Sequence, residues 1–391
     1  MSEWSEATRS KRHAAAGDAD RLGTLPDELL LDVLSVLPSP DAVRTCVLAR
    51  RWRNLWKGVP ALRITPTNAR RFWSPSALNG FVNHMLFLRD QVPLRVVELN
   101  SYNPLKDEDY FEEAVEYLEL WFRYSLSCSV AKLSVITHDD YKRWLLPKGI
   151  ITSKHLTTLE LTWVETEHNL DFSSCVSGGF EDLPLVPFLE SMPFLVEAFV
   201  RLLNCADSCK NGYEVSDCGD ESCWGCSNCK YGENICVALQ GLSSCRNLEL
   251  TAETAAFIFR KDLVRCPVFS KLKTLLLCEW CITDNLGALI CFLQHSPVLE
   301  KLALQFYDPE AHENLVVMEA CYDLRKQPLV LKDLTVEVKI YEGDERIHKV
   351  VDVLASYGLP SEKIMIKQYP KIEAQFDNTW SSGSFSFEQK I

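Results

Sequence analysis

The residues best suited to chemistry in this sequence are its cysteines, which number 16 in a chain of 391 residues. Eight of the 16 fall in the stretch 205–245. Within it, cysteines follow one another at two-residue gaps, a spacing at which a tight turn can present two thiolates to one tetrahedral zinc ion. The candidate ligand set is Cys218, Cys223, Cys226 and Cys229, with Cys236 as an alternative to Cys218.

Three interpretations of this cluster stay open. A structural zinc motif usually has two separated pairs of ligands, whereas this run lies in a polar insertion, 204–237, rich in Gly, Asn, Ser and Asp. The insertion is therefore a zinc site, a mobile loop carrying thiols, or a redox pair of cysteines. Other cysteines, such as Cys266, Cys278 and Cys291, lie within a repeat pattern, and we expect them to be buried thiols.

No other motif indicates catalysis. The sequence has no phosphate-binding glycine loop, no G-x-S-x-G and no paired-histidine zinc motif, since His312-Glu313 lacks a second histidine four positions on. The eight histidines are scattered, and each is expected to be a surface or hydrogen-bonded residue. We therefore expect a protein without enzymatic activity of its own and without a cofactor, apart from zinc at the insertion.

Charge and hydropathy exclude several kinds of partner. The chain has 41 Lys and Arg against 54 Asp and Glu, a net charge of −13, which argues against the phosphate contacts that nucleic-acid binding requires. The longest stretch free of Asp, Glu, Lys and Arg, 72–88, is too short and too polar to span a membrane. The N-terminus lacks the apolar run of a signal peptide. We expect a chain in the cytoplasm, the nucleus or both, with no nucleic-acid or membrane partner.

A compact helical segment occupies 20–62, after a polar arm, 1–19, that we expect to be disordered. Apolar residues recur every four positions at Leu25, Leu29, Val33 and Leu37, which predicts one face of a helix. Pro26 suits the first turn of that helix, because proline has no amide hydrogen to lose there. A module of about 40 residues is too small to bury its apolar face well, so this face belongs either to a partner or to the next domain's core.

A second helix and a short third segment complete the helical module. Ser39-Pro40-Asp41 predicts an N-cap and first turn for the second helix. The third segment brings together Trp52, Leu55 and Trp56 before Gly58 and Pro60 end it.

This segment resembles an F-box of the plant type, with LPDELL opening it, LP in the middle, AVRT and VLARRW following, and LW closing it. The resemblance implies binding to a Skp-type adaptor and, through it, to a cullin and a RING subunit. The positions that bury against the adaptor, or shape the surface that does, are by resemblance Leu25, Pro26, Leu29, Leu37, Val47, Leu48, Arg51 and Trp52. Ala49 departs from the family, where serine is more common at this place.

From Leu94 onward the pattern L-x-x-L-x-L recurs, which predicts one strand per repeat with alternate side chains on opposite faces. The registers start at Leu94, Val130, Leu156, Leu195, Cys245, Leu272, Leu299, Leu331 and Ser361, with two central gaps of 27 residues. Between strands, stretches such as NLGALICFLQHSP predict helices. The residues expected on the open face of the sheet, where a target protein would bind, are Thr158, Glu160, Thr274, Leu276, Lys301 and Gln305.

One strand plus one helix per unit is the leucine-rich-repeat plan, and FSKLKTLLLCEWCI with the following repeat resembles the leucine-rich repeats of plant F-box proteins. The asparagine usual at the ninth place is replaced by Trp280 after Leu272. The segment 331–370 predicts strand, helix, strand and is similar to the FBD-like end of the same proteins. It is expected to cap the repeats.

The predicted fold class is α/β, a small N-terminal helical F-box followed by an irregular leucine-rich-repeat solenoid. Its parts are a disordered arm at 1–19, an F-box at 20–62, a linker or N-terminal cap at 63–93, a solenoid at 94–370 and a tail at 371–391. The resemblance implies the substrate-recognition subunit of a Skp–cullin–F-box (SCF) ubiquitin ligase. The alternatives are a ligand-gated co-receptor with a small molecule in the repeat concavity and a scaffold that turns over no target.

Overall fold

The computed structural model describes residues 22, 24–65, 75–101, 111–139, 150–165, 188–203, 238–252, 259, 262–263, 265–282, 286–306, 331 and 333–369. The arm 1–19, the insertion 204–237 and the tail 371–391 lie outside the described residues. The candidate zinc ligands Cys218, Cys223, Cys226 and Cys229 lie outside them as well, so zinc binding at the insertion stays a prediction.

The N-terminal helical module is built from two α-helices and three short 3-10 segments: α1 (Asp27–Val36), α2 (Ser39–Arg44), η1 (Thr45–Val47), η2 (Arg50–Arg53) and η3 (Leu55–Gly58). It encloses a small core of its own, made by Leu30, Leu34, Ala42, Trp52, Val59 and Ala61. The core side of α1 is therefore the Leu30 and Leu34 face. Of the face predicted from the four-residue spacing, Leu29 and Val33 lie on the outside, whereas Leu25 and Leu37 are half-buried and pack against this core.

The start of α2 differs from the prediction. Ser39 is the first helical residue and the cap is Pro38, with no side-chain capping hydrogen bond. The Ser39 hydroxyl instead accepts a hydrogen bond from the backbone amide of Arg63 at 2.8 Å. Ser39 thus fastens α2 to a later strand, because a tertiary donor competes with the local helix amides for the same oxygen.

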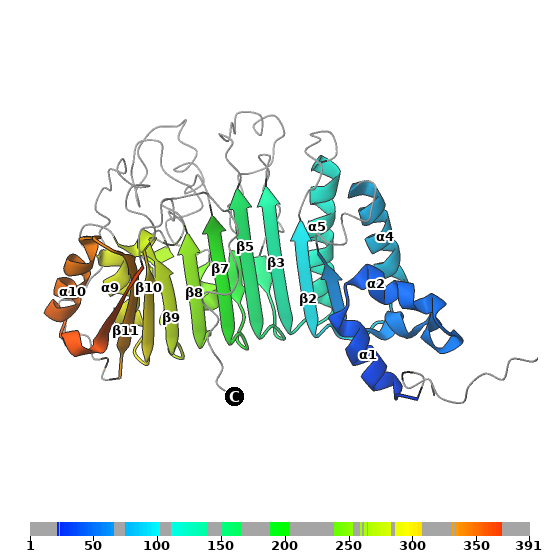
Figure 1. The fold of residues 1–391 in the computed structure, drawn as a ribbon, viewed down its shortest axis with the longest axis horizontal. Coiled ribbons are helices and arrows are strands. Elements are labelled where there is room, and N and C mark those ends of the chain that lie inside the picture. Colours follow the sequence, from blue (N-terminus) through cyan, green and yellow to red (C-terminus); the bar gives the residue numbers. More distant parts are fainter. Residues whose placement is uncertain are drawn as a thin grey trace, which may run out of the picture.

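Ten parallel strands form the main sheet, in the spatial order β1-β2-β3-β5-β7-β8-β9-β10-β11-β12. They are β1 (Ala61–Ile64), β2 (Val96–Ser101), β3 (Lys132–Asp139), β5 (Thr158–Glu165), β7 (Glu197–Leu203), β8 (Asn247–Ala252), β9 (Thr274–Cys278), β10 (Lys301–Gln305), β11 (Thr335–Tyr341) and β12 (Ile364–Tyr369). The strands lie side by side in chain order (Figure 1). The sheet begins at β1, upstream of Leu94, where the repeats were predicted to start.

The strand registers agree with the sequence pattern in eight of nine repeats. Leu275 of β9 aligns with Leu248 of β8 and Leu302 of β10, as the fourth-place residues should. The register at Leu331 was wrong by two residues, since Val336 rather than Leu334 aligns with Leu302. Alternation has a period of two, so a shift of two keeps every side chain on its face and the pattern cannot detect it.

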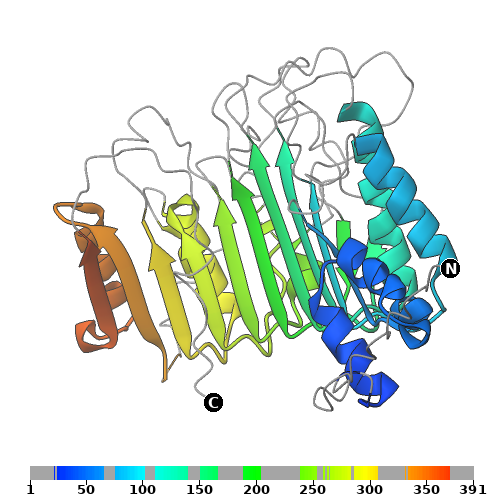
Figure 2. The ribbon, with the colours of Figure 1, turned by 45° about the vertical axis from the view of Figure 1, so that its right-hand side comes forward.

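Helices follow several strands and cover one side of the sheet (Figure 2). They are α4 (Pro75–Leu88), α5 (Phe111–Ser127), α7 (Leu239–Leu242), α9 (Gly287–His295) and α10 (Arg346–Ser356). Their buried side chains and the inward residues of the strands form one continuous core, which defines this side as the helical face. The opposite side is called the open face below. A separate parallel pair, β4 (Ile150–Thr152) with β6 (Phe188–Ser191), lies against α7.

The C-terminal end of the sheet and the residue Trp280 can be compared with what the sequence predicted. The strand, helix, strand prediction for the closing segment is confirmed as β11, α10 and β12. Trp280, which stands where an asparagine was expected, is buried, and its indole Nε1 donates to the Leu250 carbonyl of the neighbouring strand at 3.0 Å. The indole thus links adjacent repeats through a backbone acceptor. Among the described residues, no helix is both long and apolar enough to cross a membrane.

Candidate interaction surfaces

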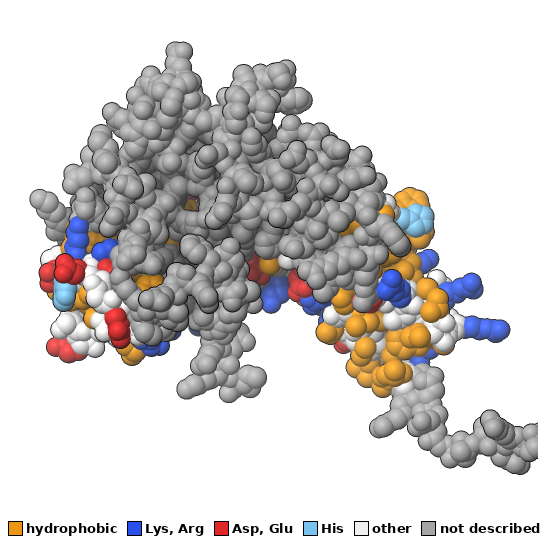
Figure 3. All heavy atoms as spheres, turned by 45° about the horizontal axis from the view of Figure 1, so that its top comes forward, with side chains coloured by type: hydrophobic (Ala, Val, Ile, Leu, Met, Phe, Trp, Pro, Cys, Tyr) orange, Lys and Arg blue, Asp and Glu red, His pale blue; other side chains and the backbone are white. Residues whose placement is uncertain are grey.

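The helical module exposes a row of apolar side chains beside its closed core. Six of the fifteen large hydrophobic side chains that are exposed among the described residues lie in 22–48: Leu22, Leu29, Val33, Val36, Val47 and Leu48. Val47 is 83% and Leu48 68% exposed. We call these six residues the adaptor surface, after the partner that the resemblance to an F-box implies. Figure 3 shows hydrophobic side chains gathered over the N-terminal end of the molecule, with Lys and Arg at their margin.

The eight residues singled out from the sequence divide into three groups in the structure. Pro26, Leu29, Val47, Leu48 and Arg51 are exposed. Leu25 and Leu37 are half-buried and pack against the module's own core, of which Trp52 is a buried member. Leu22, Val33 and Val36 were missing from the set of eight. The four-residue spacing had already placed Val33 on the same helix face as Leu29, and Val36, three residues after Val33, continues that face.

Arg51 holds the beginning of α1 in place. Its guanidinium donates to the Asp27 carboxylate, with Nε at 2.9 Å, and to the Leu25 carbonyl, with Nη2 at 2.5 Å. A planar guanidinium can serve both acceptors at once because its donors lie in a fixed fork. Arg51 therefore orients the chain that enters α1. Because Leu29, Val33 and Val36 lie on α1, Arg51 also helps to position that part of the adaptor surface.

The helical module and the sheet share strand β1, whose alternate side chains enter two different cores. Ala61 belongs to the module's core, whereas Leu62 and Ile64 belong to the core of the sheet. Polar links add to this joint: Arg63 Nε donates to the Ser35 carbonyl at 2.8 Å, and Arg95 pairs with Asp32 at 2.5 Å. A one-residue slip of β1 would expose both cores, so the joint fixes the module relative to the sheet.

On the open face, the six predicted residues lie on the side expected. Thr158, Thr274 and Lys301 fall in one row across the sheet, through the pairings β5 with β7, β7 with β8, β8 with β9 and β9 with β10. Glu160 and Leu276 fall in the next row and Gln305 in the third.

The prediction that Leu276 is available to a target protein was wrong, because only 1% of its surface is exposed. Its neighbours in the row, Glu249 and Ala303, are 4% and 3% exposed. Cys278, which follows on the same face, is fully buried, as was expected of a thiol within the repeats. The alternation rule assigns a side chain to one side of a sheet, but it does not say whether solvent reaches that side.

The middle of the open face carries a hydrogen-bonded charge network. Arg201 of β7 donates to Glu160 of β5 at 2.7 Å and to Glu249 of β8 at 2.6 Å, and Ser134 of β3 donates to Glu160 at 2.8 Å. Burial alone lowers the pKa of Arg201, but the two glutamates raise it overall. Its guanidinium also lies 5.5 Å from the Phe199 ring centroid. Four neighbouring strands are thus tied together by polar side chains.

The C-terminal end of the open face carries lysines around one carboxylate. Glu337 of β11 pairs with Lys367 at 2.8 Å and with Lys301 at 3.6 Å. Burial raises the pKa of Glu337, but the hydrogen bond from Lys367 and the nearby lysine charges lower it overall. Burial lowers the pKa of Lys339, and the nearby Glu337 carboxylate offsets part of this decrease. Lys339 and Lys367 were not among the residues predicted from the sequence.

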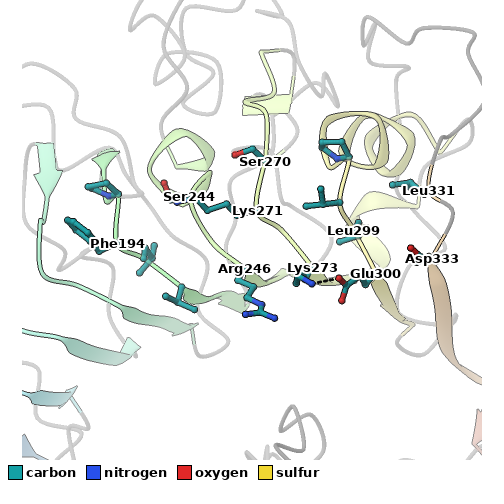
Figure 4. Close-up of a pocket in the computed structure, with 15 residues that line it drawn as sticks. Phe194, Ser244, Arg246, Ser270, Lys271, Lys273, Leu299, Glu300, Leu331 and Asp333 are labelled. Atoms are coloured by element: carbon teal, nitrogen blue, oxygen red, sulfur yellow. Dashed lines mark hydrogen bonds and ion pairs between the residues drawn. The ribbon is translucent and has the colours of Figure 1, made fainter.

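A groove of about 890 Å³ runs along the turns that precede β7 to β11. Exposed Phe194, Val196 and Val298 supply its apolar lining. Figure 4 shows Lys273 and Glu300, which form an ion pair, among the residues that line the groove, next to Arg246. The groove lies at the strand ends and not on the open face, where the sequence had placed a target or a ligand.

Comparison with known proteins identifies the N-terminal module. Residues 22–63 match the F-box domain family. The chain carries an F-box.

Three relatives, all from Arabidopsis thaliana, extend the similarity beyond it. The chain is 32% identical over 188 residues to F-box/LRR-repeat protein 13, with 47% of this chain and 40% of the relative covered. It is 31% identical over 196 residues to an FBD-associated F-box protein, with 47% and 46% covered.

A third relative covers more of the chain. An F-box/FBD/LRR-repeat protein is 32% identical over 284 residues, which are 71% of this chain and 58% of the relative. The chain therefore resembles plant F-box proteins of the leucine-rich-repeat and FBD-associated kinds, and the recognition made from the sequence is confirmed. It spans less than half of the length of the first two relatives and somewhat over half of the third.

Proposed function

We propose that this F-box protein is the substrate-recognition subunit of an SCF-type ubiquitin ligase. In this proposal the adaptor surface binds a Skp-type adaptor, and the open face binds a target protein. The observation that carries the proposal is the combination of a matched F-box with six exposed apolar side chains beside a core that is already closed. Apolar side chains that remain exposed in the folded module are suited to binding a partner protein.

The chemistry of the adaptor surface supports a protein partner. Exposed Leu and Val side chains gain free energy when a partner removes them from water, at roughly 25 cal/mol per Å² of apolar area. The side of the surface that carries Val47 and Leu48 is basic, since Arg44, Arg50, Arg51, Arg53 and Lys57 fall within 44–57 without an acidic residue. Within the described residues, only Arg44 and Arg51 of these form an ion pair, with Asp41 and Asp27 respectively. We infer an adaptor that offers an apolar groove with acidic residues at its edge.

The sheet supplies the second half of the proposal. The main sheet has ten parallel strands in sequence order. A leucine-rich-repeat solenoid requires such an arrangement, in which each repeat adds one strand beside the previous one. We propose that the repeats form such a solenoid and that its open face selects the target. The exposed or half-buried members of the predicted set, Thr158, Glu160, Thr274, Lys301 and Gln305, remain the proposed contacts. Leu276 is withdrawn from that set.

Rigidity is the property that links the two surfaces. A receptor of this kind performs no chemistry and contributes proximity, by holding the target near the ubiquitin carrier that the cullin and RING subunits recruit. The shared strand β1 gives a short, two-core connection between the adaptor surface and the sheet. The position of a bound target relative to the adaptor is then fixed by the fold.

The experiment is a binding measurement between the full chain and a purified Skp-type adaptor by calorimetry. We expect a one-to-one complex, and we expect Val47→Asp with Leu48→Asp to weaken it at least about 100-fold, since two apolar contacts become buried charges. Both side chains are largely exposed, so the double variant should keep its fold. The matched control is Leu120→Asp on α5, whose side chain is 55% exposed and lies outside the adaptor surface. Unchanged affinity in the double variant would refute the assigned surface.

A further inference from the structure

Two cysteines and one histidine converge on the helical face, at a place that the proposed function does not use. Cys266 precedes β9, whereas Cys291 and His295 lie on α9, which follows β9. One ligand atom from each residue lies within 4.8 Å of the other two. The sequence pattern gave Cys266 and Cys291 only as buried thiols. Strand β9 lies between Cys266 and α9 in the sequence. The chain returns after β9, so that α9 packs beside the segment that precedes the strand.

The spacing on α9 suits a common ligand. Residues four apart share one face of a helix, and Cys291 Sγ lies 3.8 Å from His295 Nδ1. In a tetrahedral site with metal bonds of about 2.3 Å to sulfur and 2.0 Å to nitrogen, two such atoms are separated by roughly 3.5 Å. The observed separation is close to that value, so small side-chain rotations suffice.

The surroundings of the cluster allow an ion to enter and to be held. Cys291 is 2% exposed, whereas Cys266 and His295 are half-buried. Without an ion, the Cys291 thiol lies 3.4 Å from the Leu263 carbonyl, and His295 Nδ1 lies 2.8 Å from the Cys291 carbonyl. These hydrogen bonds satisfy the groups in the metal-free protein. Metal binding would replace them, with loss of the two thiol protons and with the imidazole proton on Nε2.

We propose that Cys266, Cys291 and His295 bind one zinc ion and leave a fourth position for water or another donor. Two thiolates and an imidazole favour Zn²⁺ over the oxygen-preferring Mg²⁺ and Ca²⁺. The ion would fasten the segment before β9 to α9. The same two segments already meet through the Phe269 amide, which donates to the His295 carbonyl at 2.8 Å, and through the Phe269 and Phe292 rings. In this proposal the ion adds a link between two segments that already touch, and the proposal stands independently of the ubiquitin-ligase proposal.

The test must separate this site from the cysteine-rich insertion. The parent is the full chain in which Cys218, Cys223, Cys226, Cys229 and the alternative ligand Cys236 are replaced by serine. After equilibration with Zn²⁺ and removal of free ion, its metal content is measured by elemental analysis, and we expect about one equivalent per chain. Cys291→Ser and His295→Gln should each remove most of that zinc. The matched control is Cys281→Ser, because that thiol is also buried and donates to a carbonyl, that of Cys278, outside the cluster.

Two further readouts keep the test decisive. Cobalt in place of zinc should give the parent a thiolate-to-metal absorption band that both cluster variants lose and Cys281→Ser keeps. Zinc should also raise the melting temperature of the parent, because the ion binds the folded state, and should not raise that of His295→Gln. His295 is half-buried, so this variant remains informative even if Cys291→Ser fails to fold. Less than about half an equivalent of zinc in the parent, or equal metal in His295→Gln and Cys281→Ser, would overturn the proposal.

Discussion

The helical module and the middle strands of the sheet differ in how far their outward apolar residues are exposed. In the module, Val47 and Leu48 are 83% and 68% exposed although a closed core lies next to them. In the sheet, Leu276 lies on the open face and yet is 1% exposed, while polar residues such as Glu160 and Arg201 interact across the strands. The module therefore offers apolar area to a partner, and the sheet offers charge and hydrogen bonding.

This difference suits two kinds of recognition. Apolar burial is non-directional and gives binding strength to one recurrent partner, which is what we propose for the adaptor surface. Charged networks on a rigid frame discriminate between partners, because a wrong partner leaves groups unpaired. The open face, with Arg201 at its middle and Glu337 near its end, has the properties we expect of a target surface.

The largest effect should come from breaking the module's core. Trp52 is 7% exposed and packs with Leu30 and Leu34, so Trp52→Ala should destabilise the module by about 3 to 5 kcal/mol through lost burial and a cavity. Hydrogen exchange of the α1 amides measures this locally. Leu29→Ala, at an exposed position of the same helix, is the control and should change protection little. If both variants behaved alike, the distinction between core and adaptor surface would be wrong.

A smaller effect is expected from the open face. Arg201→Met removes both of its ion pairs and leaves the Glu249 carboxylate, whose side chain is 5% exposed, without its cation. Breaking a buried pair costs about 3 to 5 kcal/mol, and the partial exposure of Arg201 reduces our expectation to about 2 kcal/mol. Urea denaturation measures it.

A second substitution identifies the cause of that loss. Glu249→Gln in the Arg201→Met background should recover part of the stability, because the stranded charge is removed. Lys301→Met, which breaks the more exposed pair with Glu337, should cost less than about 1 kcal/mol. Failure of Glu249→Gln to recover any stability would show that lost packing, and not charge, is responsible.

The smallest effect concerns pH at the C-terminal end of the open face. The lysines around Glu337 lower its pKa below the ordinary value of 4.5, so its stabilising contribution is present above that pH and is lost as pH falls through the lowered pKa. Glu337→Gln should melt at a lower temperature than the parent at pH 7, and the difference should shrink at pH 3. A difference that stays constant from pH 7 to pH 3 would contradict the assigned ion pairs.

Much of the repeat architecture was predictable, because alternation specifies which residues face the core. The nine registers placed nine of the ten strands of the main sheet, with a shift of two residues at Leu331, and did not include β1. The F-box was recognisable from its motifs, and Leu29, Val47 and Leu48 lie outside as a partner surface requires. Helix α9, Gly287–His295, lies within the predicted stretch 285–297 and is two residues shorter at each end.

The remaining features depend on contacts between distant segments. Ser39 was predicted as a cap and instead accepts a hydrogen bond from Arg63. Leu276 was expected to be exposed and is buried. The meeting of Cys266 with Cys291 and His295 requires knowing how α9 packs against the segment before β9. Sequence periodicity reports the face of an element and not the element that lies opposite, so these features could not be derived from it.

The measurement that tests the central claim most directly is ubiquitin transfer to proteins held by the chain, in a system reconstituted with adaptor, cullin, RING subunit and ubiquitin carrier. The parent is compared with the Val47→Asp and Leu48→Asp double variant. We predict at least one protein that co-purifies with both forms and receives ubiquitin only with the parent. A bound protein that receives ubiquitin equally with both forms, or receives none although the adaptor is bound, would contradict the proposed receptor function.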